Sequence, residues 1–517
     1  MGNSASHPRM GHPWMGNSLP DLKQAMLKEI GARDIAALFE QIPQEHRLKK
    51  PLKLPEGMRS EAQLRRHLTD MMAQNESSAT HLTFLGAGCW PHHVPAVVDE
   101  IVGRTEFLTS VWGSPQSDLG RNQAWFEYAS QLGELLNMEV VSLPVYSWGC
   151  AIGHALRMAS RLTGRREVII AEIFDPERLS VVENYCEPAD MASHIAIKRV
   201  KINPKTGTID LADLKRKVSD QTAAVYFETP SYLGQFETGM AEIARIAKQA
   251  GAETLVGVDP LTLGIVKPPA DFGADIVVGP TQPMGVHMNC GGGVGGFMAS
   301  RDEERYVREY NGFLVSITET LKPGQFGFGL ASAHQTSYGM REEGKDWTGN
   351  SVYLWAIANA VYMSLLGPQG FREVGELILA QSHKAAKRLA LIKGVGIRHG
   401  SGFFKEFVVD FSKTGKTVAA INKKLRREKI FGGKNLSQEL KDFGQSALYC
   451  VTEIHTDDDI EKLAAAGMAE RHDQRLVPDR RVIGAQFHRL IAHDRTARSI
   501  AVASFSMSSS VWISVTQ

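Results

Sequence analysis

Asp259 is the acidic residue that the sequence places best for meeting a ligand. It follows the apolar run 254–258, which predicts a buried strand, and it is followed by Pro260 and Leu261. A parallel sheet binds its ligands at the carboxyl ends of its strands, so an aspartate at this point is a candidate ligand-binding group. An aspartate that only caps the next turn is the commoner case and stays open as the alternative.

Small residues gather at a second point, where a loop leads into an expected helix. Ser147, Gly149 and Cys150 lie there, within the stretch 142–151. Free backbone N–H groups and the helix dipole favour an anion at a helix start, which is how a cofactor phosphate is usually held. Ser147 could equally be an ordinary N-cap residue, and the sequence does not separate the two interpretations.

A glycine-rich segment with a nearby histidine is the third candidate. Five glycines occupy six positions over 291–296, just after His287 and Cys290. Glycine allows the backbone to approach a ligand or a neighbouring subunit closely. The segment matches neither a dinucleotide-binding fingerprint nor a phosphate-binding loop ending in Gly-Lys-Ser/Thr. A flexible loop with a solvated His287 is the alternative.

Neither a metal centre nor a disulfide framework is indicated. His92 and His93 are adjacent and would point in different directions, and neither His154 nor His287 has a close ligand partner in the sequence. The five cysteines are scattered and form no Cys-x-x-Cys pair. This pattern predicts free thiols in a reducing cytoplasm.

The elements expected to position these groups alternate along the chain. Short apolar runs predict strands at 168–171, 194–197, 223–227, 254–258 and 276–278. Helical runs at 124–136, 153–163 and 240–250 lie among them. The alternation predicts an α/β fold with a mostly parallel sheet that is covered by helices on both faces.

A smaller α+β unit is expected near the C-terminus. Two helices, 351–366 and 371–390, are separated at Gly367-Pro368, and they precede strands at 407–411 and 447–452 and helices at 418–428 and 457–466. We therefore expect a disordered leader (1–18), a helical segment (19–125), a large α/β domain (126–345), a small C-terminal domain (346–470) and an atypical Arg- and Ser-rich tail (471–517).

The bulk composition removes some classes of function. The 517 residues carry a net charge of only +1, so nothing in the charge favours nucleic acid or an anionic membrane. No run of eighteen apolar residues occurs, and no membrane span is predicted.

An ordered set of motifs over about residues 21–466 resembles one family. The chain is similar to subunit 1 of glycine dehydrogenase (decarboxylating), the alpha half of the P-protein of the glycine cleavage system. The matching segments are 26–31, 42–43, 52–55, 84–88, 94–99, 104–107, 258–261, 273–279, 364–370 and 451–453.

The resemblance implies a fold, a reaction and partners. It implies a fold-type I pyridoxal-phosphate (PLP) transferase fold, like aspartate aminotransferase, in an α2β2 assembly whose beta subunit carries the cofactor lysine. The reaction is decarboxylation of glycine with aminomethyl transfer to a lipoyl H-protein. In such a fold Asp259 pairs with the pyridinium nitrogen, while Ser147, Gly149 and Cys150 form a vestigial phosphate site. His287 and Asn350 are expected at the subunit interface or on the substrate side.

A Schiff-base lysine is missing from this chain. After Asp259, Lys267 comes too soon and Lys322 too late, and the expected position falls at 281–283, which is Thr-Gln-Pro. Without that amine no covalent cofactor chemistry is available. The sequence therefore predicts a non-catalytic alpha subunit, with PLP on the partner subunit.

Three segments depart from the family pattern, and the substrate stays open. They are 111–115, 146–151 and the region of Asn350. A paralogous PLP-dependent decarboxylase complex for another small amino acid, a self-sufficient PLP enzyme and a degenerate PLP-fold interaction protein are the alternatives.

Overall fold

In the computed structural model the chain divides into two compact units, residues 1–76 and 77–517. The structure describes residues 15–468 apart from 51, 56, 59, 109–114, 189–191, 290–293, 313, 332–336, 338–343, 347 and 349–351. The expected leader therefore lies mostly outside the described residues, and the expected tail lies entirely outside them. The domain boundaries expected from the sequence stay predictions.

The first unit is built from short helices. Helices α1 (Pro20–Glu29) and α2 (Glu61–Met72) are its longest elements, and both lie within the segment 19–125 that was expected to be helical. The Ser60 side chain accepts a hydrogen bond from the amide of Gln63 and so begins α2. Shorter 3-10 helices lie at Gly16–Ser18, Ile35–Phe39 and Gln44–His46.

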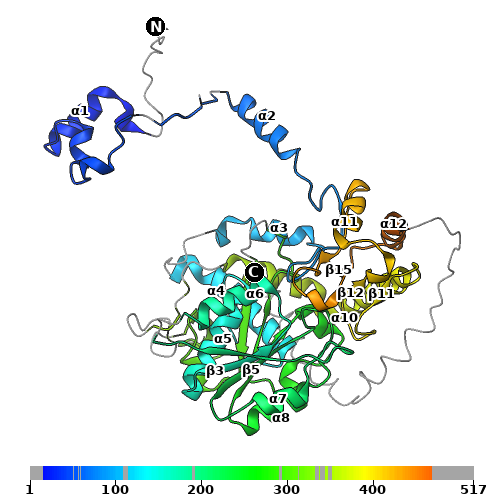
Figure 1. The fold of residues 1–517 in the computed structure, drawn as a ribbon. Helices are drawn as coiled ribbons and strands as arrows, with labels where there is room; N and C mark the ends of the chain where they lie inside the picture. Colours follow the sequence, from blue (N-terminus) through cyan, green and yellow to red (C-terminus); the bar gives the residue numbers. More distant parts are fainter. Residues whose placement is uncertain are drawn as a thin grey trace. The chain divides into compact units, whose positions relative to one another are not determined.

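A seven-stranded sheet forms the centre of the second unit (Figure 1). Its order is β2-β8-β7-β6-β5-β3-β4; the five strands from β7 to β4 run parallel, whereas β8 and β2 join antiparallel. The strands are β2 (Val140–Val141), β3 (Glu167–Ala171), β4 (Ala196–Val200), β5 (Thr222–Thr229), β6 (Glu253–Val258), β7 (Ile276–Pro280) and β8 (Gly296–Ser300). All five predicted strands are confirmed, although β4 lies slightly later than expected.

Both faces of this sheet are buried. Alternate residues of β6 and β7 enter different clusters: Val256 and Val277 pack in one, and Leu255 and Ile276 in the other. Such alternation is what two covered faces require. The helices of this region are α3 (Ala96–Val102), α4 (Pro115–Leu136), α5 (Trp148–Thr163), α6 (Pro176–Cys186), α7 (Leu211–Lys217), α8 (Met240–Gln249) and α9 (Glu304–Val307).

The long helix α10 (Leu354–Ala390) leads to a second, smaller sheet. Gly367, with φ +57°, and Pro368 interrupt it where the sequence predicted two helices. The smaller sheet is antiparallel, in the order β11-β12-β15-β14, and is accompanied by α11 (Val418–Arg427) and α12 (Asp457–Met468). Its strands are β11 (Gly396–Ile397), β12 (Glu406–Asp410), β14 (Lys434–Asn435) and β15 (Ser446–Cys450). We call residues 391–468 the C-terminal region.

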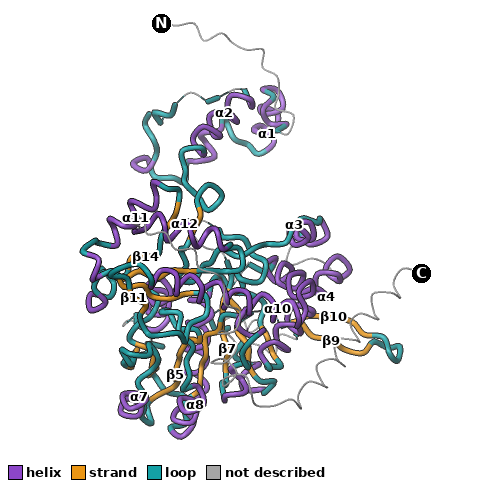
Figure 2. The backbone as a smooth tube through the Cα atoms, turned by 90° about the vertical axis from the view of Figure 1, so that its right-hand side faces the viewer, coloured by secondary structure: helices purple, strands orange, loops and turns teal. Residues whose placement is uncertain are grey.

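Two small pairs of strands complete the fold. A parallel pair joins β1 (Leu82–Thr83) to β13 (Ile430–Phe431), so the start of the second unit is tied to the C-terminal region. The hairpin of β9 (Val315–Glu319) and β10 (Phe326–Leu330) was not predicted, and it packs beside α4 (Figure 2). Among the residues that the structure describes, no helix has both the length and the hydropathy needed to cross a membrane.

Candidate functional site

Asp259 and Gln282 lie at one edge of the central sheet. Asp259 follows the last residue of β6, and Gln282 comes two residues after the end of β7. These strands are parallel neighbours, with Val256 paired to Val277. Their carboxyl ends therefore meet at the edge where the sequence predicted a ligand site.

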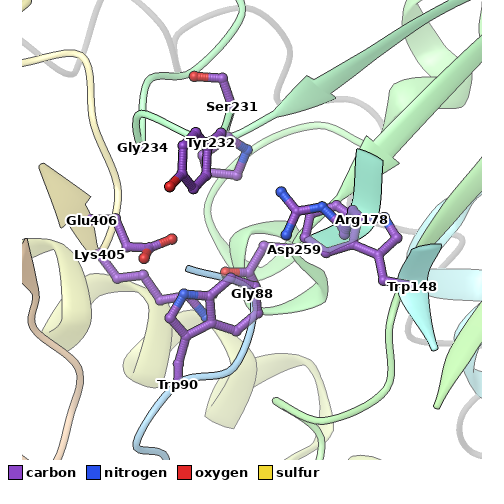
Figure 3. Close-up of a pocket in the computed structure, with 11 residues that line it drawn as sticks. Gly88, Trp90, Trp148, Arg178, Ser231, Tyr232, Gly234, Asp259, Lys405 and Glu406 are labelled. Atoms are coloured by element: carbon purple, nitrogen blue, oxygen red, sulfur yellow. Dashed lines mark ion pairs between the residues drawn. The ribbon is translucent and has the colours of Figure 1, made fainter. Parts of the chain in front are cut away.

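Asp259 already has a cation as its partner. Its Oδ2 atom lies 2.6 Å from the Nζ atom of Lys405, which immediately precedes β12 (Figure 3). Its Oδ1 atom accepts a hydrogen bond of 3.1 Å from the amide of Leu261 and so caps the 3-10 helix Pro260–Gly264. Both charged side chains are only 3% exposed, so water does little to screen the pair. The aspartate thus acts both as a turn cap and as the partner of a buried charge.

His92 and Trp90 complete the surroundings of the Lys405 ammonium group. Nζ lies 2.8 Å from Nε2 of His92 and 3.5 Å from the centre of the Trp90 ring. An ammonium group can only donate, so Nε2 accepts and the proton of a neutral His92 is on Nδ1. Nδ1 then donates to the carboxylate of Glu453 over 2.8 Å.

The pKa shifts agree with this arrangement. Burial, and then the charge of Lys405, lower the pKa of His92, which keeps the ring neutral. Burial alone would raise the pKa of Glu453, but the His92 ring and the amide of His93 lower it to about 2. We call Trp90, His92, Asp259, Lys405 and Glu453 the Lys405 cluster.

Gln282 stands where the sequence expected a Schiff-base lysine. Its Oε1 atom accepts from the amide of Trp90 over 3.1 Å, and its Nε2 atom donates to the Trp90 carbonyl over 2.9 Å. Both residues are buried. The side chain at this position therefore fixes a loop of the same chain instead of presenting a nucleophile.

A second buried ion pair forms the opposite wall. Arg178 of α6 donates from Nε and Nη2 to the carboxylate of Glu228 in β5, over 3.1 and 2.9 Å. Its guanidinium group lies 4.0 Å from the centre of the Trp148 ring. Burial would lower the pKa of Arg178, but Glu228 and Asp175 raise it, so the cation is satisfied by partners from its own chain.

The three residues of the expected phosphate site are all at the start of α5. The Ser147 side chain accepts from the amide of Cys150 over 3.2 Å and is the N-cap. A β-carbon on Gly149 would lie 3.0 Å from Val181, and one on Gly296 would lie 2.4 Å from the Ser147 carbonyl. The capping interpretation describes Ser147, and close packing within the chain explains both glycines. A phosphate role for Ser147, Gly149 and Cys150 stays a prediction.

Among the remaining candidates, His287 does not join this site. His287 is exposed, and its Nε2 atom lies 2.9 Å from Asp99 of α3. Asn350 and Cys290 lie outside the described residues. Within the described part of the chain no group of three or more His, Cys, Asp or Glu side chains could hold a metal ion.

The residues at this edge do not fit PLP. The cavity between the two ion pairs has a volume of about 10 Å³, which is the space of roughly one water molecule. The carboxylate that would face the pyridine nitrogen is bound to Lys405, and positions 281–283, directly after β7, hold no lysine. The amine that lines the cavity, that of Lys405, is paired with Asp259, and the cavity has no room for a ring.

Sequence reasoning missed the cation of this site. Lys405 follows Phe403 and Phe404 and precedes a predicted strand. A lysine among residues that are expected to be buried was the one feature of the sequence that could have indicated a buried charge here. That signal predicts a buried partner but does not identify it. His92, which was considered only as a metal ligand, and Trp90 gave no signal, because they lie in a loop.

Comparisons with known proteins agree on one family. The family model for the glycine cleavage system P-protein matches residues 13–466. A protein of Saccharolobus islandicus named probable glycine dehydrogenase (decarboxylating) subunit 1 is 37% identical over 457 residues, covering 88% of this chain and 97% of the relative. The protein of the same name from Staphylothermus marinus is 35% identical, with 87% and 97% covered.

Solved structures give the same result. The crystal structure of a glycine decarboxylase (P-protein) of the glycine cleavage system, in inhibitor-bound form, matches with a TM-score of 0.77 and 30% identity, over 88% of this chain and 99% of that one. A sphingosine-1-phosphate lyase of Burkholderia pseudomallei, 14% identical with a TM-score of 0.58, shares the fold. This chain therefore belongs to the glycine cleavage system P-protein family, as a glycine dehydrogenase (decarboxylating) subunit 1 with the fold of the type I PLP enzymes.

Proposed function

We propose that this chain is the non-catalytic alpha subunit of a glycine decarboxylase of the glycine cleavage type. The observation that carries the proposal is the ion pair of 2.6 Å between Asp259 and Lys405. It uses the carboxylate that a cofactor nitrogen would need. The amide of Gln282, at the position expected for the lysine, supports the same conclusion.

The proposal assigns the chemistry to a partner. A beta subunit of the same P-protein holds PLP, and the two chains assemble as α2β2. The complex decarboxylates glycine and transfers the aminomethyl group to the lipoyl arm of an H-protein. Four described cysteines are free thiols, which is consistent with a reducing cytoplasm as the location.

Surface residues of this chain are then available to the partner. We expect His287, which is exposed beside Asp99, and Asn350 to face the subunit interface or the substrate. Ser147, Gly149 and Cys150 keep the form of a phosphate site without a cofactor to bind. In this view the chain supports the beta subunit and completes the surroundings of its active site.

Reconstitution tests the proposal. The chain is mixed with a beta-type subunit, a lipoylated H-protein and glycine, and the release of CO₂ is measured with each component left out in turn. We expect activity only when this chain and the beta subunit are both present. Full activity of the beta subunit without this chain would contradict the assigned role. A higher rate with alanine or serine than with glycine would move the assignment to another small amino acid.

The absence of a covalent cofactor is tested on the chain alone. After incubation with PLP and reduction with borohydride, peptide mass spectrometry should find no lysine of this chain that carries a pyridoxyl group in an amount near one per chain. The partner subunit, treated in parallel, should carry one such adduct. A stoichiometric adduct on this chain would place the chemistry here and would refute the proposal.

A further inference from the structure

The ammonium group of Lys405 lies where three parts of the fold meet. Asp259 belongs to the central sheet, Trp90 and His92 to the loop that follows β1, and Lys405 itself to the C-terminal region. We propose that Lys405 is a built-in substitute for a bound cation, and that it holds the C-terminal region and the Trp90 loop in one fixed position on the central sheet. This inference does not depend on which partner or substrate the chain serves.

The surroundings of the ammonium group suit a cation. Lysine has three N–H donors and no acceptor. Here Nε2 of His92, at 2.8 Å, accepts a hydrogen bond, and Oδ2 of Asp259, at 2.6 Å, is the counter-charge. The face of the Trp90 ring, at 3.5 Å, is the third site that attracts a cation. These three partners surround the buried ammonium group and together define a binding site for a single positive charge.

The partners are themselves fixed by further bonds. The side-chain amide of Gln282 makes two hydrogen bonds to Trp90, one to its backbone N–H and one to its backbone carbonyl. Glu453 accepts from Nδ1 of His92 and from the amide of His93, each over 2.8 Å. The carboxylate of Glu453 thus sets the ring tautomer that lets His92 accept from Lys405. Removing the ammonium group would leave Asp259 buried without its counter-charge.

Backbone contacts place Lys405 as firmly as its side chain. The Lys405 carbonyl accepts from the amide of Val451 over 2.9 Å. The amide of Phe404 donates to the carbonyl of Gly234 over 3.2 Å. A β-carbon on Gly234 would lie 1.9 Å from the Glu406 carbonyl, so the two backbones touch. Figure 3 shows Gly234 and Glu406 on the same side of the pocket, with Trp90 beside Lys405.

The consequence is a site that is closed by its own side chains. Domains that close around a ligand need hinges and a gap that the ligand fills. In this chain the side chain of Lys405, which belongs to the C-terminal region, reaches Asp259 of the central sheet and bridges that gap. The pairing is therefore expected to hold the region in the position that the structure shows.

Three variants of the full chain test the pairing by thermal unfolding. Lys405→Met and Asp259→Leu each leave one buried charge unpaired, and each should lower Tm by roughly 4–6 °C. The double variant removes both charges and should recover at least half of the summed loss. Lys198→Met is the matched control, because its pair with Glu167 has the same 2.6 Å distance but Lys198 is 46% exposed. That control should change Tm by less than about 1 °C.

Additive losses in the double variant would show that the two residues do not act as a pair, and would overturn the proposal. Hydrogen exchange tests the second half of it. In Lys405→Met the amides of 84–93 and of 402–411 should both exchange at least tenfold faster, although the segments are far apart in sequence. Exchange that is unchanged in 84–93 would mean that Lys405 does not hold the Trp90 loop, and would refute the inference.

Discussion

Gln282 offers the sharpest test of how the expected lysine position is used. Its amide group makes two hydrogen bonds to the backbone of Trp90, at 3.1 and 2.9 Å, and both residues are buried. Gln282→Leu keeps most of the side-chain volume but leaves a buried N–H and a buried carbonyl without partners. Each such group costs about 1–3 kcal/mol, so the variant should lose about 2–6 kcal/mol.

This loss converts to a shift that can be measured. For roughly 400 ordered residues the entropy of unfolding gives about 1 °C of Tm per kcal/mol, so Tm should fall by about 2–7 °C. Tryptophan fluorescence should report the change, since Trp90 lies directly on this contact. Gln221→Leu, an exposed amide in a turn, is the control and should leave Tm unchanged. A Gln282→Leu variant as stable as the parent would refute the idea that this residue fixes the Trp90 loop.

Three further outcomes are expected. Burial lowers the pKa of His154 from 6.5 to about 4, so the unfolded chain binds the proton first and stability falls as pH drops from 6.5 towards 4. Between pH 7 and pH 5 the free energy of unfolding, measured with urea, should therefore fall by about 2 kcal/mol less in His154→Gln than in the parent. Equal falls in the two proteins would contradict this expectation. Gly234→Ala, at φ +84° and against the Glu406 carbonyl, should destabilise by about 3 kcal/mol or more in the same assay, and an unchanged midpoint would show that the contact is dispensable. Deletion from Arg471 should leave Tm and partner binding unchanged; a drop of more than about 3 °C would show that the tail belongs to the fold.

Much of the fold could be predicted because strand periodicity is a local signal. All seven predicted strands are present, five in the central sheet and two in the C-terminal region, and the break at Gly367-Pro368 lies where expected, since proline and glycine act on their own neighbours. The hairpin of β9 and β10 escaped prediction. Four of the five residues of β9 are exposed, so no buried stripe marks that strand in the sequence.

The site was predicted only in part, for a physical reason. Asp259 and the missing lysine could be read from single positions relative to predicted strands. The pairing of Asp259 with Lys405 depends on how the C-terminal region packs, and no spacing encodes it. The same limit applies to Gln282, whose lack of an amine was evident from the sequence but whose bonds to Trp90 were not.

The ion pair of Asp259 and Lys405 also has an evolutionary consequence. If the proposed function holds, selection on Asp259 acts through its pairing with Lys405 and therefore through stability. A mutation at either position alone leaves a buried charge, and a lysine at position 282 alone would break the bonds to Trp90. A change to a cofactor-binding site at this edge would therefore need several simultaneous substitutions, each destabilising by itself. The aspartate of this motif is therefore no evidence of a bound cofactor in chains that carry a lysine at the position of Lys405.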